Sequence, residues 1–564
     1  MVTSKIRRRR VRRTAVLVVS ALAMAAGVTG CTSAPTTTQT PTPTPVASVQ
    51  AGGTLRLAVA DGLPDGSWDP AVAPESTVRS LGPLVMATLL QPAADGGAPS
   101  PGLATSAQPN ADATVWTIQL RPGLSFSDGS PLTANDAAFW ITQAAEQPLL
   151  KTRFGAVSDA TPLKSATAVT PSTIVVTLRS PNALFDRLVL AAPEFGCVRK
   201  DYGGKSRTRY FARPLSCGAY VIESTKSTKV RLTRNPAYFA PAQVGPDVVE
   251  AVALEPGSTP ESFLREGGDL VLDPQSAPLG SDAPTASPIA TTITPTPAVS
   301  LAPSAAASVA ETTTGAIAAQ DIGTVDADGA GVVTALVFRA APPTRDTNVR
   351  IAVQTGIDVS ELVPVGSQAA DSGLVPPGWL GAQQLAAVQR NPAVAQTAVG
   401  LVSARQRQLE LTLLAGSADQ SAQASAIKKQ LSEVGLRVRL RALPINDYQA
   451  ALSGGSFDIA LVALRPRVPL AAAISQEWIA TAGLGAGWDS TEASTAFTQQ
   501  LNSPALGVGA VDGAGKFSSA VVGSVQAIPL SARRLGVVAD RARVRGLVVR
   551  LDGSVPLQLI SLTK

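Results

Sequence analysis

The most informative chemical feature of the chain is a missing residue type, because its 564 residues include no histidine. Without histidine, neither a Ser-His-Asp triad nor a Cys-His pair can form, and the usual ligand for zinc or nickel is lacking. A hydrolase would then need a Ser-Lys pair or paired carboxylates, and the sequence shows no such pattern. We therefore expect a protein that is not an enzyme and has no catalytic residue, metal or cofactor.

Thiol chemistry is left to three cysteines, and the first of them follows a segment typical of exported proteins. Seven basic residues lie within the first thirteen positions, and an apolar run follows from Ala15 to Val28. This run is short for a membrane span, but it fits a secretory signal whose positive charge stays in the cytoplasm. Residues 1–30 are therefore predicted to be a signal peptide.

The end of this signal, VTGC at Val28–Cys31, resembles the lipobox of bacterial lipoproteins. The resemblance implies cleavage before Cys31 and lipidation of that cysteine. The protein would then lie at the extracytoplasmic face of the cell membrane as a lipid-anchored protein. The alternative is an uncleaved anchor with an incidental cysteine, and the export route, Sec or twin-arginine, stays open.

The other two cysteines, Cys197 and Cys217, form an even pair in a compartment that permits disulfides. We predict a disulfide between them, which for a loop of this length would stabilise the fold by about 3 kcal/mol. The alternative is a pair of buried free thiols.

The net charge of +6 invites a nucleic-acid or membrane-surface interpretation until the charges are located. Removing the seven basic residues of the signal leaves 40 basic against 41 acidic residues. The body of the protein is nearly neutral, so the sequence indicates no basic groove and no nucleic-acid partner.

One dense stretch, RPGLSFSDGSPLTANDAAFW at Arg121–Trp140, could be a phosphate-binding loop or plain scaffold. The SDG tripeptide at Ser127–Gly129 is a turn signal between extended segments. Thr133 and Asp136 form a T-x-x-D capping box that starts a helix. Local structure accounts for the stretch, so we predict neither a phosphate site nor a catalytic loop there.

Composition divides the chain into ordered and low-complexity parts. Residues 31–51 are rich in Thr and Pro and are predicted to be a disordered tether. Residues 275–331 are poor in aromatics, lack periodicity and predict a low-complexity insertion. Further on, segments between 409 and 464 alternate strand, helix, strand, helix, strand, which is typical of an α/β layer with a mostly parallel sheet.

Several phrases match one protein family in their order along the chain. They include SWDP (67–70), TVWTIQLRPGLSFSDGSPLTANDAAF (114–139), LTRNPAYF (232–239) and IKKQLSEVGLRVRL (427–440). These phrases resemble the family-5 extracytoplasmic solute-binding proteins, which are the peptide, dipeptide and nickel receptors of ABC importers.

The resemblance implies an α/β fold, namely the two-lobed clam-shell of type II periplasmic binding proteins with an extra subdomain in the first lobe. Lobe I would comprise residues 52–274 and 526–564, and lobe II residues 332–525. The expected function is capture of an oligopeptide-like or other small polar solute between the lobes. The expected partners are an ABC permease, the peptide or small-molecule ligand and the membrane through the lipid anchor, and we expect a monomer.

The sequence departs from the family where peptide-binding members place an aspartate against the peptide's amino terminus. The matching segment here is LRPRVPL, Leu464–Leu470, with Arg465 and Arg467 where an acid is expected. In one interpretation, one of these arginines binds a carboxylate, phosphate or sugar-acid group. In the other, both are solvated on a loop that serves no ligand.

Aromatic residues, which commonly line peptide pockets, are only 4% of this chain. Three tryptophans of the second half are candidate cleft rings, although a tryptophan often lies in a core. Asp489 is the acid that could replace the missing aspartate. The candidate ligand-binding residues are therefore Arg465, Arg467, Trp488, Asp489, Trp379 and Trp478.

The arginine substitution, the insertion and the sparse aromatics also favour a second hypothesis. In it, the protein is a non-transporting descendant of the family that acts as a cell-envelope scaffold or regulatory lipoprotein. A cleft filled by the protein's own side chains would support this alternative, whereas a sealed cavity lined by Trp and Arg would support transport.

Overall fold

The computed structural model describes residues 49–563 with several gaps. The gaps are residues 60–61, 65, 74–76, 148–149, 151, 155–161, 227, 256–257, 273–320, 380, 386–388, 467, 469, 480–486, 489–490 and 504–507. The predicted signal peptide, Cys31 and nearly all of the predicted tether therefore lie outside the described residues, as does most of the predicted insertion.

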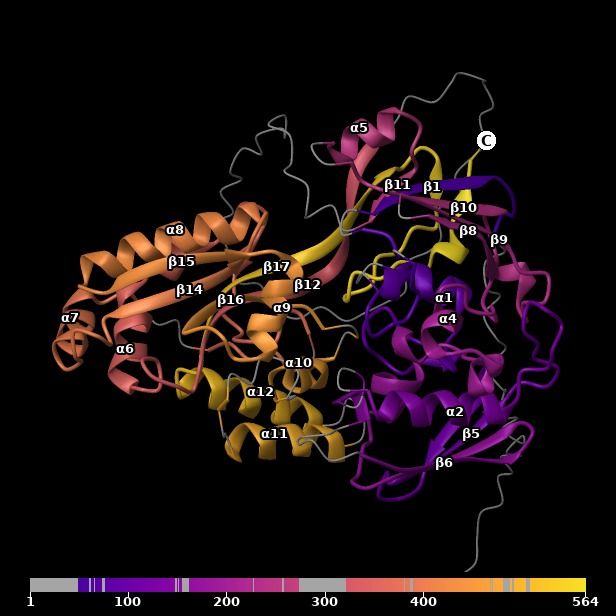
Figure 1. Ribbon diagram of the computed structural model, residues 1–564, viewed down its shortest axis with the longest axis horizontal. Coiled ribbons are helices and arrows are strands. Elements are labelled where there is room, and N and C mark those ends of the chain that lie inside the picture. The colour runs from indigo at the N-terminus through magenta and orange to yellow at the C-terminus, as the bar shows by residue number, and fades with distance from the viewer. Residues whose placement is uncertain are drawn as a thin grey trace, which may run out of the picture. The chain divides into compact units, whose positions relative to one another are not determined.

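The largest sheet combines strands from both predicted lobes in one continuous hydrogen-bonded order (Figure 1). Its order is β15-β14-β16-β12-β17-β11-β1-β10-β9-β8, with β13 paired to β17. The lobe I strands are β1 (Thr54–Val59), β8 (Tyr220–Lys226), β9 (Lys229–Arg234), β10 (Val248–Ala253) and β11 (Leu270–Leu272). In β1, the alternating residues Leu55, Leu57 and Val59 are fully buried, as their spacing predicts.

A separate four-stranded antiparallel sheet forms a subdomain of lobe I. Its order is β4 (Ala104–Pro109), β5 (Val115–Leu120), β7 (Thr173–Leu178) and β6 (Leu163–Thr170). Trp116, Ile118 and Leu120 of β5 are buried on one face, in keeping with their alternation along the strand. Helix α2 (Ala134–Ala145) packs on this sheet through β6 and β7.

The predicted capping box begins helix α2. The Thr133 backbone N–H donates to Asp136 Oδ2 at 2.8 Å, and in the reciprocal contact of the capping box the Asp136 backbone N–H is the donor towards the Thr133 side chain. Just before it, the Gly129 N–H donates to the Phe126 carbonyl at 2.9 Å in the predicted turn. Arg121–Trp140 is therefore scaffold, as the sequence predicts.

Lobe II contributes a mixed part of the large sheet. Strands β14 (Gln408–Leu414), β15 (Arg437–Leu443) and β16 (Ile459–Leu464) are parallel to one another. Strand β16 then pairs antiparallel with β12. The covering helices are α6 (Thr347–Gly356), α7 (Pro392–Gly400), α8 (Ala418–Glu433) and α9 (Ile445–Ser453).

Two long strands connect the lobes. Strand β12 (Ile322–Phe338) pairs antiparallel with β17 (Ala527–Asp540), and β17 also pairs with β11 of lobe I. The β12–β17 register shifts between Asp326 and Val332, which marks irregular pairing in the connection. Residues 322–331, which the sequence places in the insertion, thus belong to a strand. Hydrogen bonding to β17 forms this strand, and the local sequence, which is poor in aromatics and lacks periodicity, does not reveal it.

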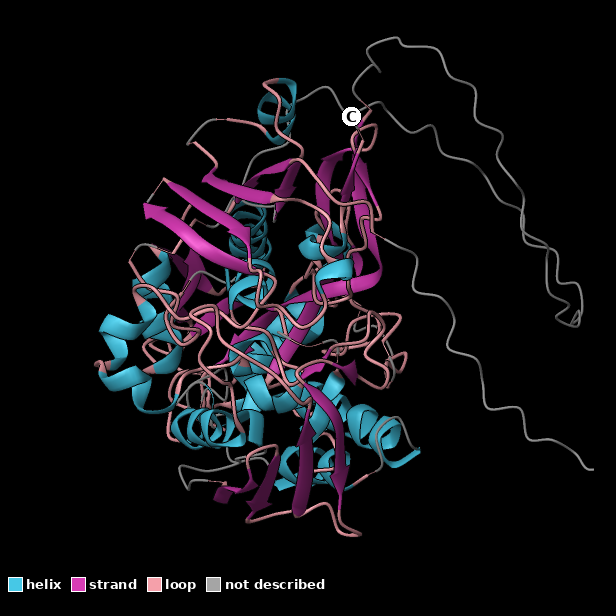
Figure 2. Cartoon of the chain, turned by 90° about the vertical axis from the view of Figure 1, so that its right-hand side faces the viewer, coloured by secondary structure: helices cyan, strands magenta, loops and turns pink. Residues whose placement is uncertain are grey.

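The remaining elements are further strands and helices around these sheets. They include π-helix η1 (Thr77–Leu81), α1 (Gly82–Val85), β2 (Leu90–Gln91), β3 (Ser100–Pro101), 3-10 helices η2 (Thr152–Phe154) and η4 (Pro193–Phe195), α4 (Arg207–Phe211), α5 (Pro260–Arg265), β13 (Gln368–Ala369), α10 (Ala471–Ile479), α11 (Thr491–Asn502), α12 (Val508–Gly523), β18 (Val544–Arg545) and β19 (Ser561–Leu562). Figure 2 shows helices and strands intermixed throughout, which confirms the predicted α/β class.

Candidate functional site

A cavity of about 50 Å³ lies where lobe I meets the segment LRPRVPL. Its walls include Arg79 and Pro83 near η1, Tyr238 after β9, the loop 550–558 and Val468 from lobe II. It combines residues that are almost 500 positions apart in the sequence. Among binding cavities it is small, because ligand pockets typically enclose about 300–1,000 Å³.

Arg79 joins the two sides of this cavity. Its guanidinium donates from Nη2 to the Arg465 carbonyl at 3.2 Å and from Nη1 to the Pro466 carbonyl at 3.3 Å. The same Nη1 also bonds to the Asp552 carbonyl. Only 3% of Arg79 is exposed, so backbone dipoles from three positions surround a buried cation.

The loop after Arg550 supplies a second cation and the carboxylate of the site. Asp552 Oδ1 accepts from the Ser554 N–H at 2.9 Å and from Ser554 Oγ at 2.7 Å. Arg550 Nη1 donates to Ser554 Oγ at 3.3 Å. Burial lowers the pKa of Arg550, and the charge of Asp552 opposes that shift.

The structure brings Arg465, one of the two arginines singled out in the sequence, to the same loop. A Cβ added at Gly553 would lie 3.4 Å from Arg465 Nη2. Arg79, Arg465 and Arg550 therefore gather around the loop that carries Asp552. Such a cluster suits an anionic group better than the ammonium of a peptide's amino terminus.

The other candidate residues have different surroundings. Trp379 and Trp478 are buried in one lobe II core cluster and do not line this cavity. Trp488 is partly buried, its Nε1 donates to the Phe338 carbonyl at 2.7 Å, and the Arg350 guanidinium lies 4.6 Å from its ring centre. Arg467 and Asp489 lie outside the described residues, so ligand binding by these side chains stays a prediction.

Apolar side chains of lobe II enter the core of lobe I beside the cavity. The lobe I core cluster includes Val468, Leu470, Phe497 and Leu501. The Ala183 N–H donates to the Leu501 carbonyl at 2.6 Å. Protein side chains thus fill much of the space between the lobes near α10 and α11.

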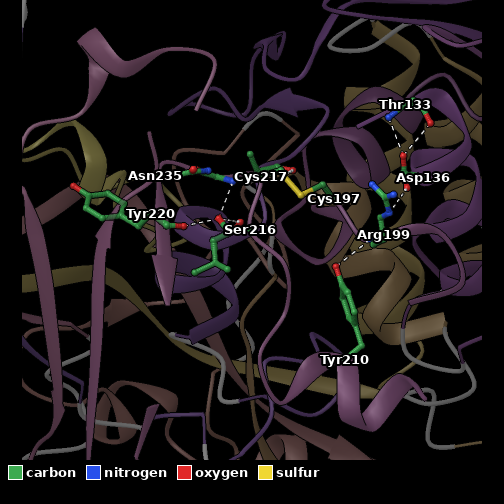
Figure 3. Close-up of a disulfide and its surroundings, with 12 residues drawn as sticks. Thr133, Asp136, Cys197, Arg199, Tyr210, Ser216, Cys217, Tyr220 and Asn235 are labelled. Carbon is green, nitrogen blue, oxygen red and sulfur yellow. Dashed lines mark hydrogen bonds and ion pairs between the residues drawn. A yellow bond between two sulfur atoms is a disulfide. The ribbon is translucent and has the colours of Figure 1, made fainter. Parts of the chain in front are cut away.

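The predicted disulfide between Cys197 and Cys217 is present (Figure 3), so the alternative of two free thiols is wrong for this structure. The backbone N–H groups of both cysteines donate to one segment of lobe I, Cys197 to Ala87 at 2.9 Å and Cys217 to Val85 at 3.0 Å. The bridge therefore fixes both ends of the intervening loop to the scaffold.

Sequence reasoning missed Arg79, Arg550 and Asp552. None of them stands in a family phrase quoted above, and no local pattern relates position 79 to position 552. The only available signal was the Asp-Gly pair at 552–553, which indicates a turn and not a site.

Comparison with known proteins identifies the family. Residues 98–483 match the model of bacterial extracellular solute-binding proteins, family 5, middle part. The chain belongs to this family. Protein XP55 of Streptomyces lividans is 31% identical over 165 residues, which are 27% of this chain and 29% of that protein. The chain spans about three tenths of the length of the curated relatives that it matches.

Solved structures confirm the fold of this solute-binding protein. AgaA from A. tumefaciens R10, in complex with agropinic acid, is 16% identical with a TM-score of 0.71. DppA from Helicobacter pylori, in complex with the peptide STSA, is 17% identical with a TM-score of 0.71. Each alignment covers 91% of this chain and 99% of the other. At these identities the likeness confirms the expected two-lobed periplasmic-binding fold and does not identify the ligand.

No helix in the described part is both long and apolar enough to cross a bilayer. Nor does that part hold a group of three or more Cys, Asp or Glu side chains placed to bind a metal ion.

Proposed function

We propose that this family-5 solute-binding protein is the lipid-anchored receptor of an ABC importer and that its solute carries an acidic group. The observation that carries the proposal is that three arginines gather at the Asp552 loop beside the cavity between the lobes. A carboxylate or phosphate would meet guanidinium groups in a partly dehydrated site, where charge-assisted hydrogen bonds are strong. That AgaA binds agropinic acid shows that this fold accommodates an acid.

The small size of the cavity limits how such a solute enters. About 50 Å³ admits one functional group and not a whole oligopeptide. Capture of a larger solute therefore needs the lobes to separate, and the irregular β12–β17 pairing is the connection about which they would move. A ligand then shifts the balance between the open and closed forms only as far as its affinity for the closed form exceeds its affinity for the open form.

Thermal-shift screening tests the solute proposal. The panel contains sugar acids, acidic peptides, neutral sugars and lysine-rich peptides, and we expect stabilisation by anionic compounds only. A ligand at 100 times its Kd stabilises by about 2.7 kcal/mol. Arg550→Gln should remove the shift, whereas the matched charge loss Arg405→Gln, at an exposed position of lobe II, should retain it. Equal shifts with cationic and anionic compounds would refute the proposal.

Fatty-acid labelling in cells tests the anchor separately. The native chain should incorporate the label and sediment with membranes, because Cys31 follows the lipobox-like VTG. The Cys31→Ala chain should do neither. Equal labelling of both chains would rule out Cys31 as the lipidation site without touching the solute proposal.

A second candidate function is a scaffold or regulatory lipoprotein that no longer transports a solute. The observation that favours it is the entry of Phe497 and Leu501 into the lobe I core, which fills space that a solute would need. No thermal shift from any member of the panel, with the protein folded and monodisperse, would favour this alternative over the importer receptor.

A further inference from the structure

A larger depression, of about 620 Å³, lies on lobe I and shares no lining residue with the cavity beside the arginine cluster. It is open to solvent and bordered by the turn at Ser127–Asp128, the loop 199–205, residues 213–216 and strand β8. Its volume falls within the range of ligand-binding pockets. Nothing in the solute-binding proposal uses it.

The wall of this depression is the loop closed by the Cys197–Cys217 disulfide. Residues 198–216 contain six basic residues and a single acid, Asp201. Arg207 is neutralised by Asp69, with Nε to Oδ2 at 2.6 Å and Nη2 to Oδ1 at 2.8 Å. Arg199 Nε also lies 3.9 Å from Asp136 Oδ1. The other basic residues of the segment still outnumber its one acid, so a local excess of positive charge remains.

Two of these cations are held in place by separate elements. Arg199 Nη1 donates to Ser130 Oγ and to the Pro131 carbonyl, both at 3.0 Å, and its guanidinium lies 5.2 Å from the centre of the Phe126 ring. Its backbone N–H donates to the Tyr210 hydroxyl at 3.0 Å (Figure 3). Arg213 Nη2 donates to the Ile222 carbonyl of β8 at 2.8 Å.

A third cation, Lys205, lies exposed on the same rim. Asp128 is the one acidic side chain of the lining. Hydrogen bonds from Ser130 lower the pKa of Asp128, so it stays ionised at neutral pH. Three cations against one carboxylate leave the lining with a net charge of +2, counted from its residues.

The rest of the lining is apolar or aromatic. Pro214, Leu215, Val221 and Ile222 form part of it, together with the rings of Tyr202 and Tyr210. Tyr202 has a φ of 52°, an uncommon left-handed conformation for a bulky residue. Such backbone persists only where its surroundings fix it, and strained residues gather at functional sites.

From these observations we propose that the depression binds an acidic, extended peptide segment of a partner protein. Arg199 and Arg213 are bound to different elements, so they suit several separated carboxylates better than one compact anion. The apolar and aromatic lining accommodates side chains between those carboxylates. A concave site of this size also fits a protruding segment, whereas a bilayer presents a broad, flat surface.

Fluorescence anisotropy tests the proposal on the full mature protein. The probe is a labelled peptide of alternating Glu and Leu, and a Lys-Leu peptide is the charge control. We expect binding of the Glu-Leu peptide alone, weakened as salt rises from about 0.05 to 0.5 M, because the contacts are solvent-exposed charges. Tight binding of the Lys-Leu peptide would overturn the proposal.

Charge reversal locates the binding. The double variant Lys205→Glu/Arg213→Glu should bind the Glu-Leu peptide at least tenfold more weakly. The matched variant Arg405→Glu/Lys428→Glu reverses two exposed cations of lobe II and should bind as the native protein does. Circular dichroism and Tm check that each variant is folded. If the reversal variant misfolds, the neutral variant Lys205→Gln/Arg213→Gln still tests the site, and it should bind with intermediate affinity. Equal affinity in native and reversal variants would place binding elsewhere.

Two further arms separate other sources of negative charge. Inorganic phosphate should compete with the Glu-Leu peptide no better than chloride does at about the same ionic strength. The reason is that the cations are held apart and do not converge on one compact anion. Vesicles of phosphatidylglycerol should not bind mature protein that lacks the lipid anchor. Displacement of the peptide by low concentrations of phosphate would identify a phosphate site and refute the proposal. Vesicle binding that is lost in the reversal variant would identify a lipid-headgroup site and refute it as well.

Discussion

At the residue scale, Arg79 shows how a single side chain connects distant segments. Its bonds to the carbonyls of Arg465, Pro466 and Asp552 replace water that burial has removed. A buried carbonyl that loses its donor is costly, and hydrogen bonds to charged groups are stronger than those between neutral groups. The cation therefore stabilises the contact between lobe I and the end of β16.

We predict that Arg79→Met lowers the free energy of unfolding by about 3 kcal/mol, because three buried carbonyls lose their charged donor. Chemical denaturation measures the change. Arg439→Met, at a side chain that is 81% exposed, is the control and should cost under about 0.5 kcal/mol. A loss below about 1 kcal/mol for Arg79→Met would show that water replaces the guanidinium.

Asp128 gives a prediction for pH dependence. Ser130 donates to its carboxylate and lowers its pKa in the folded state, so the folded pKa lies below the unfolded value of about 3.9. Its stabilising contribution is then complete above the unfolded pKa and is lost as the pH falls through the folded pKa. The stability gap between the native protein and Asp128→Asn should therefore narrow from pH 5 towards pH 2, measured by denaturation at each pH. A gap independent of pH would contradict this assignment.

At the element scale, helix α2 shows a start signal that works locally. Thr133 and Asp136 satisfy backbone donors that no carbonyl of the helix can reach. Asp136 Oδ1 also accepts from the Lys200 N–H at 2.9 Å, so the cap binds the beginning of the basic loop. One short motif thus positions both the subdomain helix and a wall of the depression.

We predict that Thr133→Ala destabilises the protein by about 1 kcal/mol through loss of the cap. Thr142→Ala lies in the same helix, where the threonine Oγ1 donates to the Ala138 carbonyl at 2.8 Å. It is the matched control and should change stability by under about 0.5 kcal/mol, because alanine is the better helix former. Equal effects of the two substitutions in urea denaturation would argue against a capping role.

At the scale of the whole molecule, the contact between the lobes is apolar as well as polar. Leu501 of α11 is buried in the lobe I core, and its carbonyl accepts a hydrogen bond from Ala183. Burial of apolar area favours the closed arrangement even without a solute. A solute must therefore compete with these contacts or use a different part of the interface.

We predict that Leu501→Asp separates the lobes, because a carboxylate in this contact would be buried without a partner. Small-angle scattering should show a larger radius of gyration, and far-ultraviolet circular dichroism should stay unchanged. Val394→Asp, at an exposed valine of α7, is the control and should leave the scattering unchanged. An unaltered radius in the folded Leu501→Asp protein would show that other contacts hold the closure.

The sequence by itself determined the features that depend on neighbours along the chain. The alternation in Val115–Leu120 is typical of a strand such as β5, the Thr133–Asp136 spacing predicted the start of α2, and the family phrases predicted the fold. These succeed because strand alternation and helix capping act over a few residues. The cysteine pair was predicted correctly because, with Cys31 set aside as the predicted lipidation site, two thiols leave a single intramolecular pairing.

Only the tertiary structure decided which charges meet. Arg79, Arg465 and Arg550 come together through contacts across nearly the whole chain, and β12 gains its first residues only by pairing with β17. The net charge of the whole body concealed the basic segment 198–216, although its six basic residues lie close together in the sequence. Long-range pairing depends on packing energies summed over many residues, so a site made of distant side chains leaves no local pattern to recognise.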